Sequence, residues 1–334
     1  MIDLSILDYS PIDENTSSQD ALRATTKLAN LADSLGFRRF WVSEHHGMQT
    51  LAGSNPEMLM MHLAASTQSI RIGSGGVMLQ HYSAYKVAEG IKLIEALYPG
   101  RIDLGVGRAP GGDKLASAAL NLGKRIIVPY EQQLHDLKEY FSDLSSLPVM
   151  PKISTKPRLW LLGTSEYSGT FAAKEGMSFV FAHFINPGDD GVAAIKNYEQ
   201  NFVASEMHQS PKTIVATFVA VATTEEEAEK LAGSFDHWLL MIESGRETPF
   251  YLSPRAIADY TYTEQEKRTI RYNRNRIIVG DALSVKRQIE ILASFYNTSE
   301  IMMMPNIFGA ENRIKGVKLL AEAFNMNNLV EEKL

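Results

Sequence analysis

The chain of 334 residues has no cysteine, which excludes disulfide bridges, thiolate metal sites and a cysteine nucleophile. It has no excess of basic residues either, since 33 Lys and Arg stand against 39 Asp and Glu, for a formal net charge of −6. A net-negative protein has no overall field that attracts phosphate backbones, so we expect no nucleic-acid partner. No apolar run approaches the ~20 residues of a membrane span, so we expect no membrane partner.

The amino terminus lacks a targeting signature. Residues 1–8 have neither the basic start nor the long apolar middle of a signal peptide. The absence of cysteine suits a reducing compartment, and we expect a cytoplasmic enzyme. What the sequence does have is ordinary globular composition, 45% hydrophobic and 22% charged, in a length that can bury a large core.

Short apolar runs alternate with longer amphipathic segments along the chain. We expect strands at residues 2–7, 40–42, 70–77, 102–106, 158–162, 179–182, 214–222 and 300–304. Three-and-four spacing of apolar residues and turn signals predict helices at residues 20–35, 56–67, 83–97, 130–141, 165–175, 188–204, 224–242, 284–295 and 311–324. Eight strands, each followed by a helix, predict an α/β protein in which residues 1–334 form a single (β/α)₈ TIM barrel, although a doubly wound open sheet uses the same units.

Two stretches break this alternation. Residues 109–129 are rich in Gly and Ala, and residues 243–279 are rich in Tyr, Arg, Glu and Pro without a regular period. Long irregular insertions in a compact enzyme often form lids or binding loops. We therefore expect an insertion after the fourth strand and a lid-like insertion after the seventh.

Polar residues or glycines stand at the ends of five successive strands, from the second to the sixth. In chain order they are Glu44, His45 and His46, then Gly75 and Gly76, then Arg108, then Thr164, Ser165 and Ser168, and last His183. The carboxyl ends of the strands form the functional rim of a parallel barrel. The sequence therefore predicts a site at this rim.

The Glu44-His45-His46 sequence predicts one imidazole at the barrel mouth. Successive residues of a strand point to opposite sides, so His45 and His46 do not both enter the mouth if the strand continues. An imidazole at the rim can donate or accept a proton near pH 7; the alternative is a pair of loop histidines that only hydrogen-bond. We expect no metal, because no His-Glu-x-x-His motif is present and no cysteine can contribute.

Thr164 and Ser165 stand at a strand-to-helix turn, which favours anion binding. The start of a helix offers free N–H groups and the positive end of the helix dipole, and Ser168 adds a further hydroxyl. Arg108 at the neighbouring strand end has the guanidinium geometry that suits phosphate. In the alternative interpretation Ser165 only caps the helix and Arg108 forms a structural ion pair.

The glycines of the third and fourth strands have a different meaning. Gly105 and Gly107 do not begin a dinucleotide-binding fingerprint, because Pro110 follows where that fingerprint needs a helix. Together with Gly75 and Gly76 they leave flat space for a planar ring near the backbone. The alternative is that a crowded barrel interior requires small residues.

Several segments resemble the bacterial-luciferase-like flavin-dependent monooxygenases. They are Trp-Val-Ser-Glu-His-His at 41–46, Ile-Gly-Ser-Gly-Gly-Val-Met-Leu at 72–79, Pro-Gly-Arg-Ile-Asp-Leu-Gly-Val-Gly-Arg at 99–108, and the segments 160–168 and 179–184. The resemblance runs in order over nearly the whole chain. It implies a homodimer of TIM barrels with reduced FMN at the carboxyl rim. It places these residues around the flavin: Gly75, Gly76, Arg108, Thr164, Ser165, Ser168 and His183.

The resemblance also implies a reaction. A separate flavin reductase would supply reduced FMN to a two-component monooxygenase, and dioxygen would give a flavin peroxide that oxidises a small organic substrate such as an aldehyde. His45 matches the catalytic histidine of luciferase, with Glu44 orienting it or the flavin. A non-prolyl cis peptide is expected near Gly75, and a mobile lid at 243–279.

Two residues depart from luciferase, and two other functions stay open. Gly107 and His183 stand where luciferase has a cysteine and a tryptophan, which argues against light emission with long-chain aldehydes. The first alternative function is a deazaflavin-dependent hydride-transfer oxidoreductase on the same barrel. The second is a flavin-binding homologue without catalytic activity.

Overall fold

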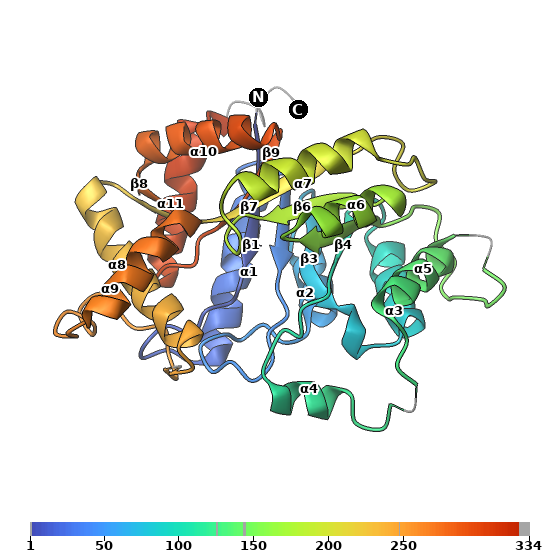
Figure 1. The fold of residues 1–334 in the computed structure, drawn as a ribbon, viewed down its shortest axis with the longest axis horizontal. Helices are drawn as coiled ribbons and strands as arrows, with labels where there is room; N and C mark the ends of the chain where they lie inside the picture. The colour runs from blue at the N-terminus through green and yellow to red at the C-terminus, as the bar shows by residue number, and fades with distance from the viewer. Residues whose placement is uncertain (1, 125, 143–144, 247, 327–334) are drawn as a thin grey trace.

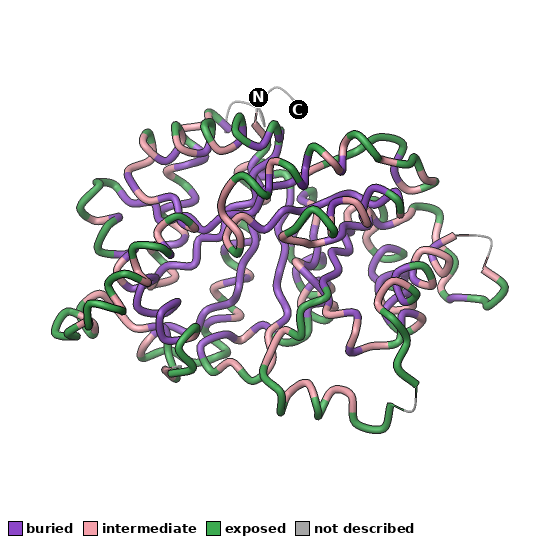
Figure 2. The backbone as a smooth tube through the Cα atoms, viewed as in Figure 1, coloured by how far each residue is buried: buried purple, intermediate pink, exposed green. Residues whose placement is uncertain are grey.

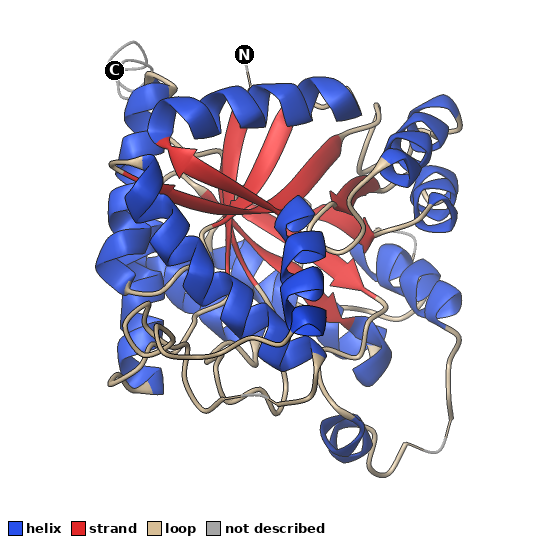
Figure 3. Ribbon diagram, turned by 60° about the vertical axis from the view of Figure 1, so that its left-hand side comes forward, coloured by secondary structure: helices blue, strands red, loops and turns tan. Residues whose placement is uncertain are grey.

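The computed structural model describes residues 2–124, 126–142, 145–246 and 248–326, and its centre is a closed parallel β-barrel (Figure 3). Its strands are β1 (Asp3–Asp8), β2 (Arg39–Val42), β3 (Arg71–Met78), β4 (Ile102–Gly107), β5 (Arg158–Gly163), β6 (Ser178–Ala182), β7 (Thr213–Ala222) and β9 (Glu300–Met304). Each strand pairs with the next in that order, and β9 pairs with β1. The prediction of an eight-stranded (β/α)₈ barrel is confirmed.

Helices cover the outside of the barrel, as Figures 1 and 3 show. They are α1 (Ser18–Ser34), α2 (Pro56–Ser66), α3 (Ala84–Leu97), α5 (Tyr130–Phe141), α6 (Glu166–Lys174), α7 (Asp189–Gln200), α8 (Glu225–Glu243), α10 (Ala282–Tyr296) and α11 (Ala310–Ala323). All nine match helices that the apolar spacing predicts. None of the helices in the described part of the chain is long and apolar enough to cross a membrane.

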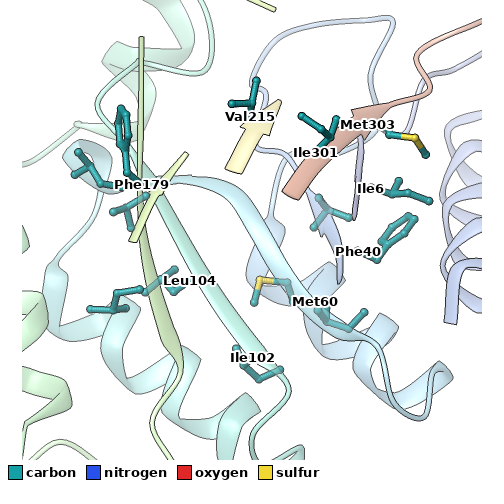
Figure 4. Close-up of a cluster of buried hydrophobic side chains, with 14 of the residues drawn as sticks. Ile6, Phe40, Met60, Ile102, Leu104, Phe179, Val215, Ile301 and Met303 are labelled. Atoms are coloured by element: carbon teal, nitrogen blue, oxygen red, sulfur yellow. The ribbon is translucent and has the colours of Figure 1, made fainter. Parts of the chain in front are cut away.

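Two hydrophobic layers hold this arrangement together. Strand residues that point outward, such as Phe179 and Ile301, pack with the covering helices in one cluster (Figure 4). Their strand neighbours Val180 and Met302 belong to a second cluster. This period of two is expected for strands that are buried on both faces, and Figure 2 shows the strands buried along most of their length.

The two insertions are more ordered than the sequence predicts. The stretch after β4 contains α4 (Lys114–Leu120), which stands away from the barrel in Figure 1. The stretch after β7 contains α9 (Glu264–Asn273) and β8 (Ile277–Asp281), which pairs with the second half of β7. The expectation of irregular structure was therefore wrong for these three elements. Asn273 is the one fully buried residue of α9, so this helix has no apolar stripe to reveal it.

Buried ion pairs join four strands at the amino-terminal end of the barrel. The Arg39 guanidinium on β2 donates to Asp103 on β4 at 2.5 Å and to Glu300 on β9 at 2.6 Å. Arg71 on β3 donates to the second oxygen of Asp103 at 2.6 Å. Residues at this end of a barrel serve stability, which leaves the opposite rim for chemistry.

Candidate active site

A cavity of about 370 Å³ opens at the carboxyl ends of β1 to β6. This volume lies in the range of small-molecule sites. The side chains and glycines around it come from the ends of β1 to β6 and from the first turns of α5 and α6. They include Tyr9, Ser43, Glu44, His45, Gly75, Gly76, Met78, Gly107, Arg108, Tyr130, Glu131, Leu162, Thr164, Ser165, Tyr167, Ser168, Phe171 and Phe184. Of the residues predicted at the rim, His46 and His183 are absent from this set.

The turn from β5 into α6 forms one end of the cavity. Ser165 is the N-cap of α6, and it forms a capping box with Ser168: each side chain bonds the backbone N–H of the other. A Cβ atom at Gly163 would lie 2.1 Å from the Ser168 Oγ atom, so this turn requires glycine. The first N–H groups of α6 have no intrahelical acceptor and form the positive end of the helix dipole. Ser165 is therefore a cap, and the turn that it caps offers donors that could hold an anion.

Arg108 lines the same cavity as Thr164 and Ser165. Its side chain is exposed and forms no ion pair with any described residue, which argues against the structural ion pair. The Arg108 charge lowers the pKa values of Tyr130 and Tyr167, although other causes raise both pKa values overall. A guanidinium without a carboxylate partner is available to an anionic ligand.

Tyr130, in the first turn of α5, contributes a hydroxyl that sequence analysis missed. Its Oη atom is buried and has no hydrogen-bond partner among the described residues. Burial raises the pKa of Tyr130, so the hydroxyl keeps its proton at neutral pH and can donate it. A buried, unpaired hydroxyl in a cavity beside Arg108 fits a ligand oxygen. No sequence pattern distinguishes Tyr130 from an ordinary helix residue.

His45 lies at the opposite end of β2 from Arg39, where it lines the cavity. Its Nδ1 atom lies 3.0 Å from the Ser43 Oγ atom, and its ring packs edge-on against Tyr9 at 4.7 Å between centroids. Burial and, to a smaller degree, the neighbouring His46 lower the pKa of His45 to about 4. At neutral pH His45 is therefore an uncharged ring that can accept a proton or share a hydrogen bond.

Glu44 does not orient His45 through its side chain. Its carboxylate is fully buried and accepts hydrogen bonds from Tyr82 Oη at 2.6 Å, from His46 Nε2 at 2.7 Å and from the Met78 N–H at 2.8 Å. Of the two roles expected for Glu44, orienting His45 or orienting the flavin, these contacts contradict the first: Glu44 instead fixes the end of β3, Tyr82 and the ring of His46. The charge of the carboxylate is satisfied by these three donors.

His183 does not line the cavity. The ring nitrogens of His183 lie 2.8 Å from Tyr296 Oη and 3.1 Å from the Asn275 carbonyl oxygen. The neighbours Ala182 and Phe184 do line the cavity, so His183 points away from it, and its expected place beside the flavin is corrected. A strand end predicts proximity to the rim, but not which side of the backbone a residue takes.

The glycines have different roles. A Cβ atom at Gly105 would lie 2.1 Å from the Ser74 carbonyl oxygen, and one at Gly76 would lie 2.8 Å from that of Gly105. At these two positions the crowded barrel interior requires glycine. At Gly107 the nearest atoms would be 3.6 Å away, so there the glycine keeps space open. The peptide bond between Gly75 and Gly76 is cis, as the resemblance implies.

No group of three or more histidine or acidic residues within the described ranges is arranged to hold a metal ion. The residues around the cavity offer neutral hydroxyls, the guanidinium of Arg108, the first N–H groups of α6 and the uncharged imidazole of His45. This set of donors matches a ligand with an anionic end and a planar apolar body.

Comparisons with known proteins identify the family of the chain. Residues 3–295 match the model of the luciferase-like monooxygenase family. The chain is 47% identical over 332 residues to YwcH of Bacillus subtilis, covering 97% of this chain and 99% of that protein. It is 39% identical over 338 residues to N-acetyl-S-alkylcysteine monooxygenase of Bacillus subtilis, covering 97% and 98%.

A solved structure extends the agreement to the fold. The crystal structure of apo-MsnO8 superposes with a TM-score of 0.89 at 32% sequence identity, covering 98% of this chain and 99% of that one. The family model and these relatives span nearly the whole barrel. The chain belongs to the luciferase-like monooxygenase family.

Proposed function

We propose that this chain is the oxygenase component of a two-component, FMN-dependent monooxygenase that acts in the cytoplasm on a small organic substrate. One observation carries the proposal: the unpaired guanidinium of Arg108 and the start of α6 share one cavity with the uncharged ring of His45. A phosphate-bearing flavin would use both ends of that cavity. Family membership supports the same chemistry.

The phosphate of FMN would be held by Arg108, Tyr130, Thr164, Ser165 and Ser168. The guanidinium offers charge-assisted hydrogen bonds, and the hydroxyls and helix N–H groups supply neutral donors. The buried Tyr130 hydroxyl without a partner supports this fit. Because Arg108 and Ser165 are exposed, flavin can enter and leave, as exchange with a flavin reductase requires.

When bound, reduced FMN would supply the electrons that activate dioxygen. Gly75 and Gly76 would leave room for the ring, while Leu162, Phe171 and Phe184 would exclude water from it. We assign His45 as the catalytic residue: its neutral ring would hold or accept a proton beside the reacting oxygen atoms. Glu44 is a positioning residue, because it fixes the Met78 N–H after the glycine pair.

Charge near the phosphate end favours FMN over a deazaflavin. Glu131 lines the cavity and accepts a hydrogen bond from Tyr167 Oη at 3.1 Å. A carboxylate there would repel the additional carboxylates of a deazaflavin tail, whereas FMN brings only its phosphate, which Arg108 can neutralise. The experiment described below distinguishes the proposed reaction from hydride transfer with a deazaflavin.

The name of one relative indicates which substrates to test first. N-acetyl-S-alkylcysteines are the first substrates to test, because a relative at 39% identity is named for oxidising them.

We also propose a homodimer, in which the second copy covers α2. This helix has apolar residues on all sides, and Met58 on it is 70% exposed. A helix of that kind is normally covered.

Anaerobic titration with reduced FMN, followed by a pulse of dioxygen, tests the proposal. We expect saturable binding, and then oxygenated product from N-acetyl-S-alkylcysteines with little hydrogen peroxide. Tight FMN binding with peroxide released as fast as from free reduced FMN would support a non-catalytic homologue instead. Turnover only with a deazaflavin and without oxygen would support hydride transfer.

A further inference from the structure

His183 connects the wall of the cavity to the segment between α8 and β8. The segment, described at residues 244–246 and 248–276, ends in a short helix, η2 (Arg274–Arg276), that leads into β8. Arg274 is tied to α8 through Asp236 at 2.8 Å, and Arg276 through Glu243 at 2.5 Å. The side chain of His183 reaches Asn275, the residue between these two arginines, from the end of β6.

The hydrogen bonds of His183 define its protonation. The Asn275 carbonyl oxygen, 3.1 Å from Nε2, can only accept, so Nε2 carries a proton. In the neutral ring Nδ1 is then an acceptor, so the one proton of the Tyr296 hydroxyl, 2.8 Å away, is donated to Nδ1. The Gly188 carbonyl oxygen at the start of α7 lies farther from that hydroxyl, at 3.2 Å, and competes for the same proton. One imidazole thus joins β6, α10 and η2.

The neighbours of His183 explain why this connection matters for the site. Ala182 and Phe184 line the cavity on either side of it in sequence. The Phe184 ring packs edge-on against Phe218 of β7 at 5.2 Å, and its N–H donates to the Ala216 carbonyl at 3.1 Å. The backbone that presents Phe184 to the cavity is therefore the same backbone that His183 fastens to Asn275.

We propose that His183 is a positioning residue that fastens η2 to the cavity wall and thereby fixes Phe184 in the lining of the cavity. The role differs from flavin binding, since His183 faces away from the cavity. Its importance for the reaction rests on the proposed function, but the connection itself does not. Loss of the two ring hydrogen bonds should increase local opening of residues 274–281 about three- to ten-fold.

Hydrogen exchange followed by mass spectrometry tests this inference. In His183→Phe, which keeps the ring volume but removes both bonds, exchange of peptides covering 274–281 should rise about three- to ten-fold. His183→Gln keeps an N–H that can reach Asn275 and should restore most of the protection. Tyr296→Phe keeps the Asn275 bond and should have a smaller effect, and His135→Phe on the exposed side of α5 serves as a control with no effect.

Two further measurements separate this role from others. Ring ¹⁵N shifts of the wild-type protein at pH 7 should show the Nε2–H tautomer for His183, and an Nδ1–H tautomer would overturn the inference. FMN affinity of His183→Phe should stay within two-fold of the wild type. If the wild type fails to bind FMN, the proposed function fails while the exchange result still decides this inference. Unchanged exchange in both His183→Phe and Tyr296→Phe would refute it.

Discussion

In the proposed reaction, His45 is the residue on which the chemistry depends. Replacing it with Asn keeps a polar side chain near Ser43 but removes the ring atom that can hold a proton over the cavity. We expect oxygenated product to fall about 10²- to 10⁴-fold, the usual range for loss of a general acid or base, while FMN affinity changes less than three-fold. Product yield and flavin titration measure the two quantities. A variant that keeps its product yield would remove His45 from the reaction.

The depressed pKa of His45 also affects stability. Because burial lowers the pKa from 6.5 to about 4, the unfolded chain binds a proton in this window that the folded protein does not. The stability that the neutral ring provides is complete above pH 6.5 and is lost as the pH falls towards 4. Burial raises the pKa of Asp236 from 3.8 to about 6. Asp236 therefore has the opposite effect: protonation of its carboxyl group stabilises the folded protein as the pH falls below 6.

Comparison with His45→Asn isolates this contribution, because Asp236 is present in both proteins. The free energy of unfolding should decrease between pH 7 and pH 5 by about 1–2 kcal/mol more in the wild type than in the variant. Urea unfolding at the two pH values provides the measurement. An equal decrease in both proteins would mean that His45 titrates normally.

At the scale of elements, the close approach of β3 and β4 requires glycine at position 105 but not at position 107. Gly105→Ala would place a Cβ atom 2.1 Å from the Ser74 carbonyl oxygen, whereas Gly107→Ala would meet only the flexible Met78 side chain at 3.6 Å. We expect Gly105→Ala to lower the free energy of unfolding by about 1–3 kcal/mol, and Gly107→Ala to change it little. Similar unfolding midpoints for the two variants would contradict the barrel geometry described here.

The elements differ in how well the sequence predicts them. Helix α1 is predicted closely because its signals are local: Ser17 and Asp20 form the capping box, and apolar residues follow at helical spacing. Helix α9 is missed because it buries almost nothing and owes its place to contacts such as Arg246 with Glu266. Strand β8 does have a signal, the run Ile277–Val279 before the capping residue Asp281, but pairing with β7 decides its structure.

At the scale of the whole molecule, the two ends of the barrel divide stability from function. Arg39 lies between Asp103 and Glu300 at the amino-terminal end, and all three are buried. Arg39→Met would leave two carboxylates without their shared partner and should cost about 3–5 kcal/mol. FMN affinity of the folded fraction should not change.

Lys230→Met is the matched control, because Lys230 pairs with Glu226 on the exposed face of α8. Its unfolding free energy should stay within about 0.5 kcal/mol of the wild type. Thermal and urea unfolding of the two variants compare a buried with an exposed pair. If Arg39→Met unfolds like Lys230→Met, the buried network does not hold the strands together.

The topology of the barrel explains which parts of the site are predictable. Arg108, Thr164 and His45 are far apart in sequence, but each follows a strand, and parallel strands bring their carboxyl ends to one rim. The partners of Glu44 and the direction of His183 are not predictable in this way, because they depend on side-chain packing between loops. Tyr130 is recognisable only through the burial of its hydroxyl in three dimensions.

The most direct test of the central claim is anaerobic titration of wild type, Arg108→Leu and Arg108→Lys with reduced FMN and with reduced riboflavin, which lacks the phosphate. If Arg108 and the start of α6 hold a phosphate, Arg108→Leu should weaken FMN binding about 10- to 150-fold, as expected for a charge-assisted hydrogen bond. Arg108→Lys should lose less, and riboflavin binding should be the same in all three proteins. Equal FMN affinity in wild type and Arg108→Leu would contradict the account.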